Sequence, residues 1–368
     1  MRSLLISVFS AMLGLGIVSP LMPLYARDLG ATGIWLGMIF SGFSFSRAVF
    51  MPIIGRLSDR FGKKIFITIG LALYSVISVI YIIAENVYEL VAIRIFHGFS
   101  SAMVIPCAMA YISEIAPEGS EGKYMSSFNI SMLLGIGFGP IIGGIIKDVL
   151  GLKFAFLSMS ILTVLAFLLV MLFVPNVKVK RKSSGGFKIL LNKLLNALII
   201  FRLSQAFRLA LVMSFLPILI SHLRGYQIGI VISAIVLTNA VFQKPFGVLA
   251  DRYDRRNLIL LGSLTSITSL VLLPFYDKFA NVLMLGVAMG IGNAMATSSA
   301  SAIAVNLGRE LGHGTVMGFF NMALSIAMTI SPLLAGFIMD VYGLDSVFFI
   351  IAIISAVGVF IFYALSKV

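Results

Sequence analysis

Twelve apolar stretches run through this sequence, and they constrain its fold more than any other feature. Each has about 20 residues or more, the length that an α-helix needs to cross the hydrocarbon core of a bilayer. Apolar residues make up 60% of the 368 positions and charged residues only 11%, against roughly 25% charged residues in an average soluble domain. We therefore expect an all-α polytopic membrane protein with twelve transmembrane helices. Their expected limits are 3–26, 33–55, 65–84, 88–112, 124–146, 152–174, 197–220, 227–248, 257–276, 280–305, 314–339 and 343–365.

Lysine and arginine residues are unevenly distributed between the loops. With the N-terminus placed inside, 17 of them fall on the inner side, 5 on the outer side and 5 within spans. Because cytoplasmic loops of membrane proteins are enriched in these residues, the sequence predicts a multi-pass protein of the cell membrane with both termini in the cytoplasm. The same bias explains most of the net charge of +13 without a nucleic-acid partner.

The sequence repeats itself at an offset of 192 residues. Matched pairs include Asp59 and Asp251, Asn129 and Asn321, Pro140 and Pro332, and Asp148 and Asp340. Each half holds six spans, so both halves have the same orientation, and parallel repeats of this kind place a solute site between them near the midplane. We predict two pseudo-symmetric six-helix bundles, at 1–174 and 197–368, joined by a basic cytoplasmic linker at 175–196.

The predicted linker carries six cations and no acid. Its second part, residues 187–193, can form an amphipathic helix on the anionic inner leaflet, which would make membrane lipid a partner. A solvated basic linker explains the same composition, and the sequence leaves both interpretations open.

A charged motif follows the second span, and a weaker copy occurs 192 residues later with Asp254 in place of glycine. Together they resemble the loop 2–3 signature of the major facilitator superfamily, and the resemblance covers the whole chain. It implies the major facilitator fold and transport by alternating access. The motif residues are Gly55, Asp59, Arg60, Gly62, Lys63 and Lys64 in the first copy, and Gly247, Asp251, Arg252 and Arg255 in the second.

We interpret these motifs as a conformational latch. Asp59 lies at the cytoplasmic end of the second span, and the eleventh span begins on the same side near residues 312–314. A carboxylate docked at a helix N-terminus is stabilised by the partial positive charge there. Asp251 and the start of the fifth span, near residues 122–123, form the symmetric counterpart. Loops that only satisfy the positive-inside rule are the simpler alternative.

The fourth span carries Arg94 and His97. Their surroundings resemble a second signature of the family, in which the arginine is linked to proton coupling. Because an imidazole titrates near neutral pH, we take both residues as candidates for proton coupling. The alternative role of His97 is hydrogen bonding between helices.

The fifth span contains a glycine-proline string that resembles the signature of the exporter branch, the drug:proton antiporters. Small residues at this spacing let helices approach closely, and a proline permits a bend, so we expect a helix-packing hinge. The string consists of Gly135, Gly139, Pro140, Gly143 and Gly144.

None of the 14 acids is expected at mid-membrane. Exporters of lipophilic cations that resemble this chain carry a buried carboxylate in the first span, and this chain has none there. Arg208 lies near the centre of the seventh span instead, where it either meets an anionic substrate or is tethered to carbonyls or Ser204. The candidates for the substrate cavity are Arg208, Gln205, Asn293, Thr297 and Ser101.

The leading prediction is a secondary active transporter that exports small amphipathic solutes or drugs, in exchange for protons. An alternative is the transport of small organic anions bound by buried arginines, and a remote one is a non-transporting membrane receptor or scaffold. We do not expect an enzyme, a cofactor or a metal site, since the sequence has no phosphate-binding loop, metal cluster or nucleophile triad.

Overall fold

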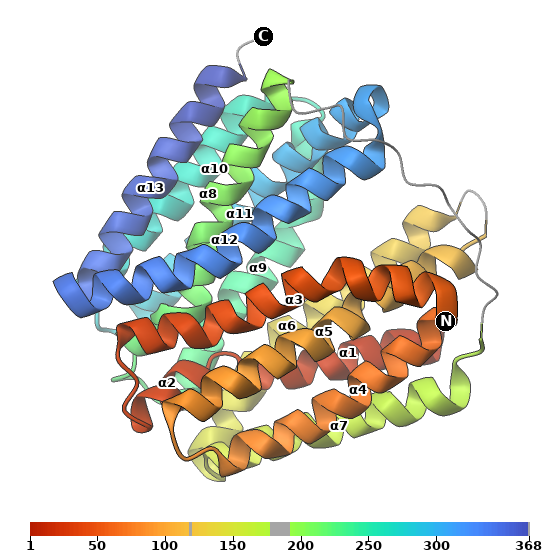
Figure 1. The fold of residues 1–368 in the computed structure, drawn as a ribbon. Helices are drawn as coiled ribbons and strands as arrows, with labels where there is room; N and C mark the ends of the chain where they lie inside the picture. The colour runs from red at the N-terminus through yellow and green to blue at the C-terminus, as the bar shows by residue number, and fades with distance from the viewer. Residues whose placement is uncertain (118–119, 177–191, 367–368) are drawn as a thin grey trace. The chain divides into compact units, whose positions relative to one another are not determined.

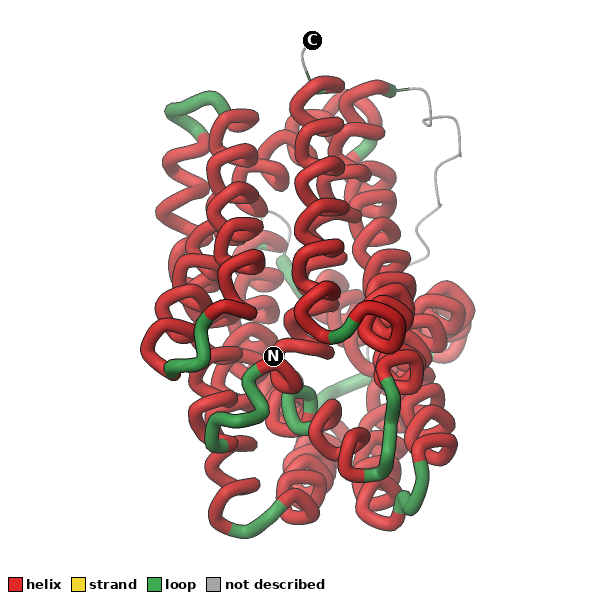
Figure 2. The backbone as a smooth tube through the Cα atoms, turned by 90° about the vertical axis from the view of Figure 1, so that its left-hand side faces the viewer, coloured by secondary structure: helices red, strands yellow, loops and turns green. Residues whose placement is uncertain are grey.

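The computed structural model describes residues 1–117, 120–176 and 192–366, and every regular element within these ranges is helical (Figures 1 and 2). Twelve spans in them are long and apolar enough to cross a membrane, counting α1 with α2 as one. The predicted all-α fold with twelve spans is thereby confirmed. The helices are α1 (Arg2–Val18), α2 (Met22–Asp28), α3 (Gly33–Phe61), α4 (Lys63–Ile80), α5 (Val87–Ile115), α6 (Glu121–Val149), α7 (Leu152–Phe173), α8 (Lys193–Leu219), α9 (Gly225–Ala250), α10 (Arg255–Leu272), α11 (Phe279–Leu311), α12 (His313–Tyr342) and α13 (Leu344–Leu365), and 3-10 turns follow α4 at Tyr81–Ile83 and α10 at Leu273–Phe275.

The first span is interrupted, whereas the sequence predicts one continuous helix over 3–26. Helix α1 ends at Val18 and α2 begins at Met22. Pro20 lies in the gap; it has no N–H to donate, and its ring would clash with the carbonyl four residues earlier in a continuous helix. The N–H of Leu21 instead donates to the carbonyl of Val18 across a tight turn, at 3.0 Å.

The chain forms two compact units. Unit 1 comprises Met1–Ala31, Met38–Lys182 and Leu223–Ser233, and unit 2 comprises Thr32–Gly37, Ser183–His222 and Ala234–Val368. The first turn of α3 therefore belongs to unit 2, and the first turns of α9 belong to unit 1. Residues 177–191, which include most of the predicted linker and of its amphipathic segment, lie outside the described residues.

In unit 1, α1 packs against α6 and α7, and α4 packs against α5 and α7. The glycine-proline string lies on two faces of α6. Gly135, Gly139 and Gly143 face the backbone of α1, while Gly144 faces Gly225 at the start of α9. A Cβ on Gly139 would lie 2.5 Å from the Cα and the carbonyl carbon of Gly16, so this contact requires glycine.

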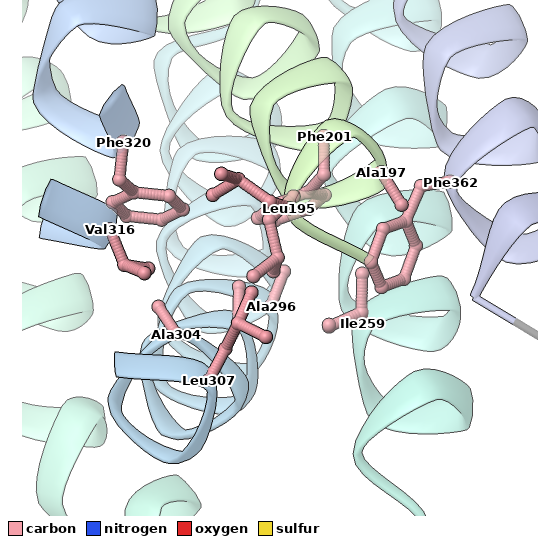
Figure 3. Packing of buried hydrophobic residues seen from close by; sticks show 12 residues of the cluster. Leu195, Ala197, Phe201, Ile259, Ala296, Ala304, Leu307, Val316, Phe320 and Phe362 are labelled. Carbon is pink, nitrogen blue, oxygen red and sulfur yellow. The ribbon is translucent and has the colours of Figure 1, made fainter. Parts of the chain in front are cut away.

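In unit 2, α8 packs against α12, α13 and α11, and α10 packs against α11 and α13 (Figure 1). A buried apolar cluster fills the space between these helices near the start of α8. Figure 3 shows Phe201 of α8, Phe320 of α12 and Phe362 of α13 converging in it. The other members are Leu195, Ala197 and Leu198 of α8, Ile259 of α10, Ala296, Ala300, Ala304 and Leu307 of α11, and Val316 of α12.

We expect Gly139→Ala to lower the stability of the protein by about 1–3 kcal/mol, because the added methyl group would force α1 and α6 apart. The measurement is the thermal unfolding midpoint of the purified protein in detergent. Gly318→Ala is the matched control, since a Cβ at this position in α12 would meet no atom within 4 Å. An unchanged midpoint for Gly139→Ala would contradict the close packing.

Candidate functional site

The first copy of the charged motif forms an ion-pair network within unit 1. The Lys63 ammonium lies 3.1 Å from the Asp59 carboxylate and also pairs with Glu114 near the end of α5. Lys63 is buried, with only 6% of its surface exposed, whereas the Asp59 side chain is 65% exposed. The network joins the ends of α3, α4 and α5, and it leaves most of the Asp59 carboxylate accessible.

Gly62 forms the turn between α3 and α4 at a φ of +98°, a left-handed conformation that side chains rarely adopt. The second copy has Asp254 at this position with a φ of −61°. Its carboxylate accepts a hydrogen bond from the Arg256 N–H at 2.9 Å and so caps α10. The two copies of the motif therefore use different turns.

The central cation of the second copy pairs with one carboxylate, whereas that of the first copy pairs with two. Arg255 takes the place of Lys63 and lies 3.3 Å from Asp251, whose side chain is 71% exposed. At the position of Glu114 the repeat has Asn306. The Nε of Arg255 instead donates to the carbonyl of Ala250, at 2.9 Å.

Arg94 is held among aromatic rings in unit 1. Its guanidinium lies 5.0 Å from the ring centroid of Phe40 and 5.2 Å from that of Phe43, both on α3. Arg94 is only 3% exposed, and its Nε has no hydrogen-bond partner among the described residues. Cation–π contacts partly offset the cost of burying this charge.

His97 lies one turn further along α5 and is fully buried. Its Nδ1 is 3.1 Å from the hydroxyl of Tyr81, and its ring makes edge contacts with Tyr74 and Phe43. Its Nε2 has no hydrogen-bond partner within the described part of the chain. The structure therefore brings the two candidates for proton coupling together in one buried cluster. Among the described residues, no carboxylate contacts either side chain. Ser101 lies one turn beyond and is also buried, in unit 1.

Three of the cavity candidates lie together in unit 2. Gln205 of α8 donates to the Thr297 hydroxyl of α11, and Thr297 donates to the carbonyl of Asn293 at 2.7 Å. Arg202 donates to the Gln205 amide oxygen at 2.7 Å and lies over the ring of Phe320, 4.7 Å from its centroid. A polar chain thus runs from Arg202 along α8 and across to α11.

Arg208 differs from the other buried cations. It is 2% exposed, and none of its three guanidinium nitrogens has a hydrogen-bond partner among the described residues. The Ser204 hydroxyl donates to Ile200 and does not bond to it. A buried charge inside a span is costly and marks a functional position by default, so Arg208 is the strongest candidate for contact with an anionic group.

The sequence analysis missed the role of two aspartates at helix ends. Asp340 of α12 accepts hydrogen bonds from the N–H groups of Gly33 and Ile34, at 2.6 and 2.8 Å, within unit 2. Asp148 of α6 accepts from Gly225 and Tyr226, at 3.0 and 2.8 Å, within unit 1. Each carboxylate satisfies N–H groups that a helix start leaves unpaired and complements the partial positive charge there.

Both the donors and the acceptors of these caps obey the repeat, because Gly33 and Gly225 are also 192 residues apart. The repeat of the aspartates was the signal in the sequence. The repeat did not identify the N–H groups that these aspartates bind, because a glycine at the start of a span can be present for several other reasons.

No group of three or more His, Cys, Asp or Glu side chains that would hold a metal ion occurs among the residues described. Cys107, the sole cysteine, is buried on α5 as a free thiol.

Comparison with known proteins identifies the family. The sequence model of the Major Facilitator Superfamily matches residues 4–226 and 198–368. An uncharacterised MFS-type transporter of Methanocaldococcus jannaschii is 31% identical over 364 residues, which cover 96% of this chain and 94% of the relative. The quinolone resistance protein NorA of Staphylococcus aureus is 28% identical over 348 residues, covering 91% and 89%. The crystal structure of a bacterial homologue of the human lysosomal transporter Spinster has a TM-score of 0.85 at 11% identity, covering 100% and 96%.

We expect Asp340→Asn to destabilise the first turn of α3 by about 1 kcal/mol, because the amide keeps the shape of the carboxylate but loses its charge at the helix start. Faster hydrogen exchange at the N–H groups of Gly33 and Ile34 would report this loss. Asp28→Asn is the control, since Asp28 is exposed at the end of α2. Equal exchange rates in the Asp340 variant and the control would show that the cap contributes nothing.

Proposed function

Because the chain belongs to the major facilitator superfamily of membrane transporters, we propose that it exports small amphipathic solutes or drugs across the cell membrane in exchange for protons. The observation that carries this proposal is the buried cluster of Arg94 and His97, in which a titratable ring lies beside a fixed charge. Both termini lie in the cytoplasm in this proposal, as the distribution of Lys and Arg favours.

Two observations support export. NorA, named for quinolone resistance, is similar to 91% of this chain. The glycine-proline string that resembles the exporter signature lies against the backbone of α1, with Gly139 beside Gly16. Close contacts of this kind let two helices move as one body when a transporter changes conformation.

In the proposed coupling, the His97 ring gains and loses a proton during each cycle. Nδ1 lies 3.1 Å from Tyr81 of the 3-10 turn after α4, and Nε2 has no partner among the described residues. When Nδ1 carries the hydrogen and donates to the Tyr81 hydroxyl oxygen, Nε2 has a free lone pair and accepts a proton without breaking that hydrogen bond.

The charged motifs act as the latch in this proposal. Asp59 and Asp251 each keep one ion pair four residues along the chain and leave more than half of the side chain exposed. An exposed carboxylate held at a fixed place at the end of a helix remains able to dock at a helix N-terminus in one conformation and leave it in another.

We expect His97→Gln to abolish the response of transport to an imposed pH gradient while leaving exchange of solute without a gradient. Glutamine retains a hydrogen bond to Tyr81 but cannot carry a proton. The measurement is solute movement in proteoliposomes with matched cationic, neutral and anionic amphiphiles. Tyr81→Phe is the control, because it removes only the hydrogen bond. Gradient-driven movement that survives in His97→Gln would assign the ring to helix packing, and no movement of any amphiphile by the unmodified protein would refute the exporter proposal.

A second candidate function is the transport of organic anions, and the unpartnered guanidinium of Arg208 favours it. A carboxylate or phosphate on the substrate would accept two hydrogen bonds from this group. The polar chain from Arg202 to Thr297 lies on the same two helices, α8 and α11. Anion transport and export are compatible, since the charge of the solute does not determine the direction of transport.

We expect Arg208→Gln to reduce the transport of anionic amphiphiles about tenfold to a hundredfold, the effect of losing a hydrogen bond between charged groups. Neutral and cationic amphiphiles should be unaffected. Lys244→Gln is the control, because it removes an exposed cation from α9. An equal loss for all three charge classes would make Arg208 a structural residue, and normal anion transport would place the anion site elsewhere.

A further inference from the structure

A cavity of about 490 Å³ opens on unit 2 at the second copy of the charged motif. Its walls come from the start of α8, the turn between α9 and α10, α11 and the end of α13. Its lining includes Arg252, Arg255 and Arg256 together with the apolar side chains of Leu194 and Ile303. The positive-inside distribution places this cavity at the cytoplasmic face of the membrane.

The positive charge of the cavity exceeds what its carboxylates neutralise. Asp251 pairs with Arg255, and the Asp254 carboxylate is occupied as the cap of α10. Arg252 and Arg256 make no ion pair within the part of the chain that the structure describes. The guanidinium of Arg256 lies over the ring of Tyr363, 5.4 Å from its centroid, and its Nε is buried without a hydrogen-bond partner.

The first copy of the motif buries its central cation in an ion-pair network. There Lys63 pairs with both Asp59 and Glu114, and the Lys64 ammonium donates to the carbonyl of Met171 at 3.0 Å. In the second copy Asn306 replaces the second acid. In unit 2 the arginines that make no ion pair line a cavity, so their charge lies where a ligand can enter.

We propose that this cavity binds a phosphate group, supplied by the headgroup of an anionic membrane lipid or by a soluble phosphate. The planar guanidinium fork matches phosphate oxygens, and a basic pocket between transmembrane helices on the cytoplasmic side suits phospholipid headgroups. Arg252 and Arg256 supply the free donors, while Arg255 is held by its hydrogen bonds to Ala250 and Asp251.

The apolar part of the lining favours a lipid as the source of the phosphate. Leu194 and Ile303 pack against the buried cluster of unit 2 that Figure 3 shows, so this part of the lining is well supported. A lipid can place its glycerol backbone and first acyl carbons there while its phosphate meets the arginines. Inorganic phosphate would use only the arginines. The proposal does not depend on the transported solute or on proton coupling.

The test is the binding of defined ligands to the purified full-length protein in detergent, measured by thermophoresis. The probes are dihexanoyl phosphatidylglycerol, dihexanoyl phosphatidylcholine and inorganic phosphate. We expect phosphatidylglycerol to bind about thirtyfold more weakly to Arg252→Gln/Arg256→Gln, since each arginine near a membrane surface contributes a severalfold gain. Arg60→Gln/Lys64→Gln is the matched control, because it removes the same charge from the first copy, and its binding should be unchanged.

The outcomes separate the two sources. Stronger binding of phosphatidylglycerol than of inorganic phosphate assigns the site to lipid, and equal binding of both, with the same dependence on the arginines, assigns it to a soluble phosphate. Two outcomes overturn the proposal. One is an equal loss of binding in the control variant. The other is binding of phosphatidylcholine that is as strong as that of phosphatidylglycerol and does not depend on the arginines. If the double variant fails to elute as a folded protein, Arg252→Gln alone, which changes an exposed side chain, should still weaken binding about fivefold.

Discussion

The hydrocarbon core of a bilayer offers no water to backbone N–H and C=O groups, and this constraint determines most of the structure. Every described element is a helix because a helix satisfies its own backbone. The unsatisfied backbone groups are then confined to the helix ends, and side chains from distant helices form hydrogen bonds with some of them. Asp340 at the end of α12 and Asp148 at the end of α6 each cap the start of another span. These caps are 307 and 77 residues away from the N–H groups that they satisfy.

The two halves of the chain share one sequence repeat, and the charged side chains at its matching positions differ. Where α5 has Glu114 to pair with Lys63, α11 has Asn306 at the matching position of the repeat. Where Gly62 makes a left-handed turn, Asp254 caps the next helix. In one copy the central cation pairs with two acids, and in the other copy three arginines line a cavity. The pairs that stay constant, such as the two capping aspartates, are the ones that helix geometry requires in both halves.

The sequence was sufficient for the number and type of the spans, since span length and apolar composition are local properties. It did not predict the break at Pro20, because hydropathy does not register a missing N–H. Contacts between distant residues could not be predicted either, because they follow no fixed spacing in the sequence. Examples are the ion pair between Glu114 and Lys63 and the contacts of Arg94 with aromatic rings. Of the site, the sequence identified Arg94, His97 and Arg208 as unusual because charge inside an apolar span is costly. Their partners depend on tertiary packing.

The buried charges bear on which solutes this transporter is suited to carry. Arg94 and Arg202 are both positive, and each lies against aromatic side chains with no carboxylate paired to it among the described residues. Arg208 lacks even this support among the described residues. A positive potential in a medium of low dielectric repels a cationic solute far more strongly than it would in water. Solutes that are neutral, zwitterionic or anionic avoid this repulsion, and an acidic group lowers the cost of burying Arg208 as well as its own.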